Sequence, residues 1–193
     1  MSQIKFVAIL LLLYLPGICF CQKSKTTSGD SAFYQIPFKD NQIVYEKVYY
    51  LDSVNNKEQI FNAVKSVLIR NTNYKYSKID EDRVSGNITA QISYDVVSKP
   101  GIAKLLYACK STISIDVKEN RYRVKLFNNS SSTMVLGHLF EGTMEQQYEG
   151  ELDSLKKGKW RAGRSTILDW NLMLTLILDG FSTNIKEDLR DNF

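Results

Sequence analysis

The chain has 193 residues, of which 44% are hydrophobic and 24% charged, a composition typical of a globular domain with one buried core. With 10 glycines and 3 prolines it is neither collagen-like nor of low complexity, and its apolar fraction excludes a chain that is disordered throughout. The net charge of +4 comes from 25 basic and 21 acidic residues that are interspersed, so we expect no nucleic-acid partner.

Residues 1–21 have the layout of a secretory signal peptide. A single lysine precedes the apolar run Phe6–Leu15, and the dipeptide Pro16-Gly17 breaks that run. The run is shorter than the roughly 20 apolar residues that cross a bilayer, which argues against an uncleaved anchor. A lipid-modified cysteine would need a small residue before it, whereas Cys21 follows Phe20. We therefore expect cleavage near Cys21-Gln22 and export to the periplasm, the cell envelope or the medium.

The mature chain is expected to have no transmembrane helix. Residues 22–32 are polar and lack periodicity, which predicts a disordered lead-in to a single domain over residues 33–193. Only Cys109 would remain after cleavage, so no internal disulfide can form and the core must hold the fold. We interpret Cys109 as a small buried strand residue, because a nucleophilic thiol needs a cationic partner and the chain has 1 histidine.

A strand, a helix and two further strands are expected in the first part of the domain. Ile43–Leu51 is rich in β-branched and aromatic residues, which predicts the first strand. Asn55 and Glu58 have the spacing of a capping box and predict the start of a helix. The apolar face of this helix would be Ile60, Val64, Val67 and Leu68. Tyr74–Glu81 is the next expected strand, closed by the turn Asp82–Gly86.

The clearest strands follow. Apolar residues alternate with polar ones from Ile88 to Val96, a pattern that buries one side of an antiparallel strand. Two more alternating segments flank Glu119-Asn120, which predicts a hairpin with a two-residue turn. This register pairs Val117 with Tyr122, Ile115 with Val124, Ile113 with Leu126, and Asp116 with Arg123. Because every inward residue meets an inward residue, the register is supported independently of strand propensity.

The last part of the chain is less uniform. Asn128–Ser132 (NNSSS) predicts a loop, and Met134–Gly158 shows no pattern that assigns it. From Ser165 to Arg190 the 3.6-residue period returns and predicts a long amphipathic helix across the sheet. Its apolar face would be Trp170, Leu174, Ile177, Leu178, Phe181, Ile185 and Leu189.

No catalytic motif is present. His138 has Glu141 three residues on but no second histidine, and Asp80-Glu81-Asp82 lacks the spacing of a calcium loop. The chain has no GxSxG, GxxxxGK[ST] or GxGxxG sequence, so the usual acyl-transfer and nucleotide loops have no support. We therefore predict no catalytic residues, no metal site, no cofactor and no enzymatic activity.

A basic stretch before the final helix is the candidate partner surface. Cations surround an aromatic residue there, a composition suited to anionic head groups or to an acidic protein. The alternative is a solvated connecting loop. The stretch comprises Lys156, Lys157, Lys159, Trp160, Arg161 and Arg164.

The order of these segments resembles a Gram-negative bacterial family of exported proteins, described as a domain of unknown function with a TBP-like fold. The resemblance spans Gln42–Asn129 and rests on IVYEKVYYL, KEQIFNAVKSVLI, YKYSKIDEDRVSG, NITAQISYDV and the hairpin TISIDVKENRYRVKL. It implies a curved antiparallel sheet with helices on one face and an exported location. It implies no catalytic residue, because the family has no established activity.

We expect an α+β domain, TBP-like or helix-grip-like, in which a twisted antiparallel sheet of four to six strands carries one helix after the first strand and a long C-terminal helix. The leading functional hypothesis is a non-enzymatic exported module that binds an envelope or extracellular protein. One alternative is a carrier of a small apolar ligand between the sheet and the C-terminal helix, which requires a hollow layer there. A carboxylate-based hydrolase is the third hypothesis.

Overall fold

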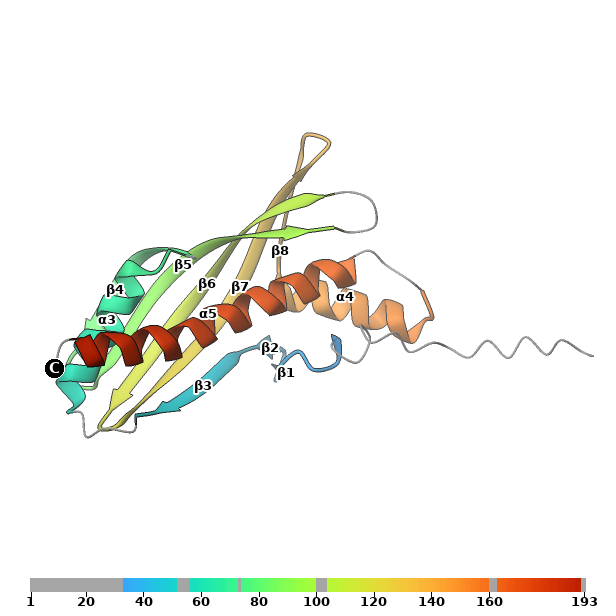
Figure 1. Cartoon of the computed structure of the whole chain (residues 1–193). Helices are drawn as coiled ribbons and strands as arrows, with labels where there is room; N and C mark the ends of the chain where they lie inside the picture. The colour runs from blue at the N-terminus through green and yellow to red at the C-terminus, as the bar shows by residue number, and fades with distance from the viewer. Residues whose placement is uncertain (1–32, 52–55, 73, 100–103, 160–162, 192–193) are drawn as a thin grey trace, which may run out of the picture. The chain divides into compact units, whose positions relative to one another are not determined.

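The computed structural model describes residues 33–51, 56–72, 74–99, 104–159 and 163–191. In this part of the chain a twisted antiparallel sheet of six strands packs against three helices, which confirms the α+β class and the expected strand number (Figure 1). The predicted signal peptide at 1–21 and the lead-in at 22–32 lie outside the described residues. No helix of the described part is both long and apolar enough to span a membrane.

The strands of the main sheet lie in the order β3-β7-β6-β5-β4. β7 pairs along one edge with β3 through Arg121–Leu126 and with β8 through Ser130–Val135, so β3 and β8 follow one another along that edge. β1 and β2 form a separate two-stranded sheet. The bounds are β1 Phe38–Lys39, β2 Gln42–Ile43, β3 Tyr45–Tyr50, β4 Lys75–Asp82, β5 Asn87–Ser98, β6 Leu105–Lys118, β7 Arg121–Val135 and β8 His138–Thr143.

The predicted hairpin is confirmed pair by pair. Val117 lies opposite Tyr122, and the pairs toward Ile113 and Leu126 follow in the expected register. The strand predicted from Ile88 to Val96 is β5, whose inward side chains are all buried. The first predicted strand, Ile43–Leu51, is divided between β2 and β3.

The N-cap of helix α3 (Lys57–Arg70) lies one residue after the predicted cap, Asn55. The N-cap is Asn56, whose side chain accepts a hydrogen bond from the Gln59 N–H at 2.9 Å, while the Gln59 side chain accepts from the Asn56 N–H at 3.0 Å. Asn55 and Glu58 are three residues apart, as Asn56 and Gln59 are, so the sequence pattern fits a cap at Asn55 as well as one at Asn56. The predicted buried face is confirmed, because Ile60, Val64, Val67 and Leu68 are all buried.

The segment Asn128–Ser132 is a strand and not the predicted loop. It lies inside β7, paired with β6 on one side and with β8 on the other. Asn128 has a positive φ of 53°, and the register of β6 and β7 shifts beside it, between Lys110 and Thr112. This irregularity turns Asn129 into the core, where its side chain is completely buried. Polar composition predicted a loop because the hydrogen-bond partners that stabilise Asn129 are distant in sequence.

Those partners form a chain of hydrogen bonds through the core. The Trp170 indole N–H donates to the Tyr94 hydroxyl at 2.8 Å, and that hydroxyl lies 2.9 Å from Ser111 Oγ. Ser111 Oγ donates to Asn129 Oδ1 at 2.7 Å, and Asn129 Nδ2 donates to the Ile43 carbonyl at 3.0 Å. Since Ser111 has one proton, Tyr94 must be the donor in their contact. The chain connects the long helix, three strands and β2.

Met134–Gly158, for which no pattern was assigned, contains the end of β7, then β8 and helix α4 (Met144–Lys156). Thr143 is the N-cap of α4, and its Oγ1 accepts from the Gln146 N–H at 3.2 Å. The Gln146 side chain accepts from the Thr143 N–H, which completes a capping box. Met144 and Tyr148 are buried on the inward side of this helix. The sequence predicted two helices, whereas the described residues form three.

Helix α5 (Gly163–Asp191) covers the sheet, as predicted, and begins two residues before the expected start. All seven residues of its predicted apolar face are buried. The Tyr49 hydroxyl donates to the Leu178 carbonyl at 2.6 Å, and the Tyr122 hydroxyl to the Phe181 carbonyl at 3.3 Å. Side chains from helix and sheet thus meet directly across the layer in which the sequence analysis placed an apolar ligand.

Candidate binding surface

The three helices of the described residues lie against one face of the main sheet, and none of them covers its other face. Along β5, β6 and β7 the side chains alternate between the buried inner face and the outer face. We call the uncovered side the outer face. Since side chains of directly paired residues share a face, the strand register places each outer residue beside known neighbours.

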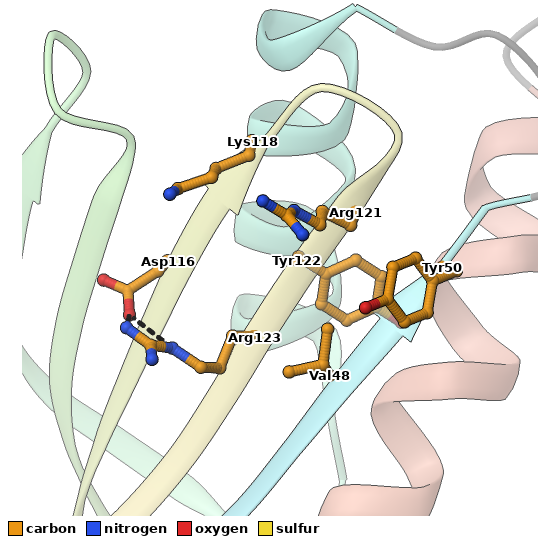
Figure 2. A pocket seen from close by; sticks show the side chains of 7 residues that line it. All are labelled: Val48, Tyr50, Asp116, Lys118, Arg121, Tyr122 and Arg123. Carbon is orange, nitrogen blue, oxygen red and sulfur yellow. Dashed lines mark hydrogen bonds and ion pairs between the residues drawn. The ribbon is translucent and has the colours of Figure 1, made fainter.

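A shallow basic pocket lies at the hairpin end of this face, with a volume of about 210 Å³. Figure 2 shows Arg121 between Lys118 and Tyr50, and the Arg123 guanidinium group against Asp116. The pocket is lined by Val48 and Tyr50 from β3, Asp116 and Lys118 from β6, and Arg121, Tyr122 and Arg123 from β7.

Two rows of paired residues build the basic pocket. Lys118 lies opposite Arg121, which lies opposite Tyr50 on the next strand. In the second row Asp116 lies opposite Arg123, which in turn lies opposite Val48. The hairpin turn therefore sets the geometry of the pocket, because a shift by one residue would send these side chains to the inner face.

The Asp116–Arg123 pair, predicted from the hairpin register, is confirmed as an ion pair on the outer face. Arg123 donates to Asp116 Oδ2 from Nε at 2.9 Å and from Nη2 at 2.5 Å. Burial works to raise the pKa of Asp116, but the hydrogen bonds from Arg123 and Asn87 outweigh it and hold the pKa below its ordinary value. Asp116 is therefore a charged partner of Arg123 at neutral pH, and it is not suited to the role of a general acid.

A row of exposed aliphatic side chains crosses the opposite end of the outer face. Val97 pairs with Leu106, and Met134 pairs with Leu139. The two pairs are adjacent, because the Thr133 hydroxyl donates to the Leu106 carbonyl at 2.7 Å. We call these four residues the apolar row; Val97, Leu106, Met134 and Leu139 are 49%, 58%, 59% and 60% exposed.

A groove of about 460 Å³ lies on the inner side of the same end, between the β7–β8 hairpin and α4. Gln147 of α4 donates to Ser131 Oγ at 3.1 Å across its base. Most of the lining is uncharged and mixes aromatic rings with hydroxyl and amide groups, which suits a neutral ligand. The lining residues are Tyr107, Ser131, Thr133, Val135, Phe140, Glu141, Gly142, Gln146 and Gln147.

The basic stretch predicted as a partner surface is divided by the fold. Lys156 ends α4, and Lys157 forms an ion pair of 2.7 Å with Asp153. Arg164 turns inward beside the buried Glu151 and donates to the Lys159 carbonyl at 2.8 Å. Trp160 and Arg161 lie outside the described residues. As a partner surface this stretch stays a prediction.

The structure places the other residues that the sequence analysis considered as candidates in the core, in a turn and on an exposed strand. Cys109 is a buried residue of β6, and burial raises its pKa to about 12, so its thiol is protonated at neutral pH. Asp82 Oδ1 accepts from the Val84 and Ser85 N–H groups in the turn. His138 opens β8 on an exposed strand. Within the described ranges, no three histidine, cysteine or acidic residues are placed to hold a metal.

Sequence reasoning missed both features of the outer face. The basic pocket had a usable signal: extending the predicted hairpin register by one pair places Lys118 opposite Arg121. The apolar row had none, because Met134 and Leu139 lie in the segment for which no strand was assigned. The position of Met134 near Leu106 depends on the long extension of β7 past the expected loop.

One open sheet face and one helix-covered face define an α+β domain of two layers. Neither family models nor curated proteins match the chain in sequence. Among solved structures, a TBP-like protein from Parabacteroides distasonis has a TM-score of 0.51 and 16% identity, and the match covers 77% of this chain and 96% of that one. A DUF4468 family protein from Bacteroides ovatus has a TM-score of 0.51 and 14% identity, covering 76% of this chain and 90% of that one.

At these identities the likeness is one of fold. The chain has a TBP-like fold, which confirms what the resemblance in sequence implied. The two related structures are described by fold and by a family of unknown function, and neither description names an enzymatic activity. Function must therefore be argued from the surface of this chain.

Proposed function

We propose that this chain is an exported, non-enzymatic binding module that contacts an envelope or extracellular protein through the apolar row. The observation that carries the proposal is the row itself. On an outer face that is mostly polar, four aliphatic side chains about half exposed to solvent stand side by side on four strands. Contiguous exposed apolar groups of this kind mark interaction sites on soluble domains.

The charges around the row favour a protein over an anionic lipid surface. The neighbouring row on the outer face runs through Asp95, Ala108, Ser132 and Glu141, so acidic residues stand at both of its ends. Both carboxylates are exposed. They would repel anionic head groups, whereas a protein surface can supply cations that complement them.

Photocrosslinking at the row tests this function. A photoreactive amino acid is placed at Leu139 and, as the matched control, at Gln91, an exposed polar position of the same face on β5. Irradiation of cells that export the chain should give one discrete protein adduct from position 139 and none from position 91. The adduct should disappear when Leu106→Ser is added. Equal labelling from both positions, or adducts to lipid alone, would contradict the proposal.

A small ligand in the groove beside Tyr107 is a second candidate function, favoured by the groove's volume and mixed lining. This candidate places the ligand in the groove and not between α5 and β5, because Trp170 of α5 and Tyr94 of β5 contact each other directly there. Native mass spectrometry of the chain purified from the periplasm without detergent tests it. A mass above that of the protein alone would support a carried ligand, and Phe140→Asp should then abolish the excess. A mass equal to that of the protein alone would contradict it.

A further inference from the structure

The basic pocket contains two cations that the fold leaves uncompensated. In its second row, Asp116 neutralises Arg123, which Glu46 also approaches at 3.5 Å. In the first row, Lys118 and Arg121 lie directly opposite each other, and no carboxylate of the described residues lies within ion-pair distance of either. The acidic residue of the connecting turn, Glu119, is exposed and does not line the pocket.

Opposed like charges destabilise a pair of strands, so this arrangement has a cost in the absence of an anion. The repulsion between the two cations is weak on a solvated surface. An anion placed between them would attract both, so that the arrangement becomes stabilising. Guanidinium and ammonium groups are the side chains that bind phosphate and sulfate in proteins, the first through paired N–H donors and the second as a point charge.

The Tyr50 side chain completes the set of groups that face the space. It extends the Lys118–Arg121 row by one strand, lines the same pocket and is 66% exposed. The hydroxyl is a further hydrogen-bond donor, and the exposed ring offers a flat surface to whatever carries the anion. A volume of about 210 Å³ has room for a tetrahedral oxyanion together with part of a larger molecule that carries it.

We propose that this pocket binds a phosphate or sulfate group, held by Lys118, Arg121 and the Tyr50 hydroxyl, with Arg123 kept in place by Asp116. This inference goes beyond the proposed protein contact, because it concerns the other end of the outer face. Neither site requires the other. The ligand is either a free oxyanion or the phosphate of a larger molecule such as a lipid head group.

Titration with inorganic phosphate, followed by amide NMR at constant ionic strength, tests the proposal. Saturable shifts should occur in the amides of Lys118, Arg121 and Tyr50, with chloride giving none. The paired variant Lys118→Gln/Arg121→Gln should weaken binding by about tenfold or more, since it removes both uncompensated charges. The control Lys110→Gln removes a cation from the same face outside the pocket and should leave binding unchanged.

A stability measurement keeps the test independent of whether a variant folds well. Without phosphate, Lys118→Gln should be at least as stable to urea as the wild type, because it removes a like-charge contact. With phosphate, the wild type should gain stability and the paired variant should not. A wild type that phosphate fails to stabilise, or a response shared by the paired variant, would overturn the proposal.

Vesicles distinguish the two sources of the anion. Binding to vesicles of phosphatidylglycerol but not of phosphatidylcholine, lost in the paired variant, would identify a lipid phosphate as the ligand. Binding of inorganic phosphate without vesicle binding would identify a small soluble oxyanion. The crosslink from Leu139 should be the same in the paired variant and in the wild type, so failure of one proposal is distinguishable from failure of the other.

Discussion

At the scale of single residues, Asn129 explains why a polar segment is part of the central sheet. Its amide is completely buried, accepts from Ser111 Oγ and donates to the Ile43 carbonyl. The neighbouring Asn128 takes a positive φ of 53°, a conformation that asparagine adopts more readily than most residues. One asparagine therefore supplies a backbone irregularity and the next supplies buried hydrogen bonds.

We predict that Asn129→Ala lowers the free energy of unfolding by about 2 to 4 kcal/mol, because it leaves the Ser111 hydroxyl without its acceptor and the Ile43 carbonyl without a donor inside the core. Urea unfolding followed by circular dichroism measures the change. Asn128→Gly is the matched control: it keeps the positive φ and removes an exposed side chain with one long hydrogen bond, of 3.4 Å, to Thr112 Oγ1. Its effect should therefore stay within about 0.5 kcal/mol. A loss of similar size in both variants would show that the network does not stabilise the fold.

At the scale of elements, prediction succeeded where the pattern is local. The hairpin around Glu119-Asn120 follows from alternation on both sides of a two-residue turn, and its register was correct in all four predicted pairs. Helix α3 was found by its periodic face, although its cap was one residue off. Two capping pairs fit the sequence equally well, Asn55 with Glu58 and Asn56 with Gln59. Only the backbone conformation decides between them.

Prediction failed where an element depends on distant partners. β8 has little burial of its own, because four of its six residues are exposed, and it exists as a strand by pairing with the extended end of β7. Helix α4 has only four buried residues, and one of them is Glu151. Its weak apolar pattern did not identify it, although Thr143 and Gln146 have the spacing of the capping box that starts it.

We predict that Thr143→Ala destabilises the protein by about 1 kcal/mol, because the Gln146 N–H loses its acceptor at the start of α4. The urea midpoint of the variant measures this. Thr175→Ala removes a hydroxyl from the interior of α5, where it bonds only to the Asn171 carbonyl on an exposed surface, and should change stability by less than about 0.5 kcal/mol. If the two variants were equally stable, the cap would have no role in holding α4.

At the scale of the whole molecule, one long helix joins the layers. α5 contacts β3 and β5 and packs beside α3 and α4, so its apolar face joins the sheet to both of the other helices. Its opposite side is exposed and includes Leu172 and Leu176. The two sides of the same helix therefore provide a direct comparison of buried and exposed leucines.

Leu174→Ala should lower the free energy of unfolding by about 2 to 5 kcal/mol, because Leu174 is completely buried between helix and sheet and its removal leaves a cavity. Leu172→Ala, on the exposed side of α5, should change it by less than about 0.5 kcal/mol. Chemical unfolding of both variants in parallel gives the two values. A small loss for Leu174→Ala would mean that the layer is loosely packed, and it would restore the carrier hypothesis in its original place.

Local patterns in the sequence were enough to predict the α+β class, the hairpin register, the buried face of α3 and the buried face of α5, because each depends on a repeat of 2 or 3.6 residues within one segment. The same register already implied the Asp116–Arg123 pair. Only the tertiary structure decided that Asn128–Ser132 is a strand and that β8 and the apolar row exist. Those features require β6, β7 and β8 to lie side by side, and α4 to pack beside them. No local repeat specifies such neighbours, since the energy that holds them comes from pairing and burial between segments far apart in the chain.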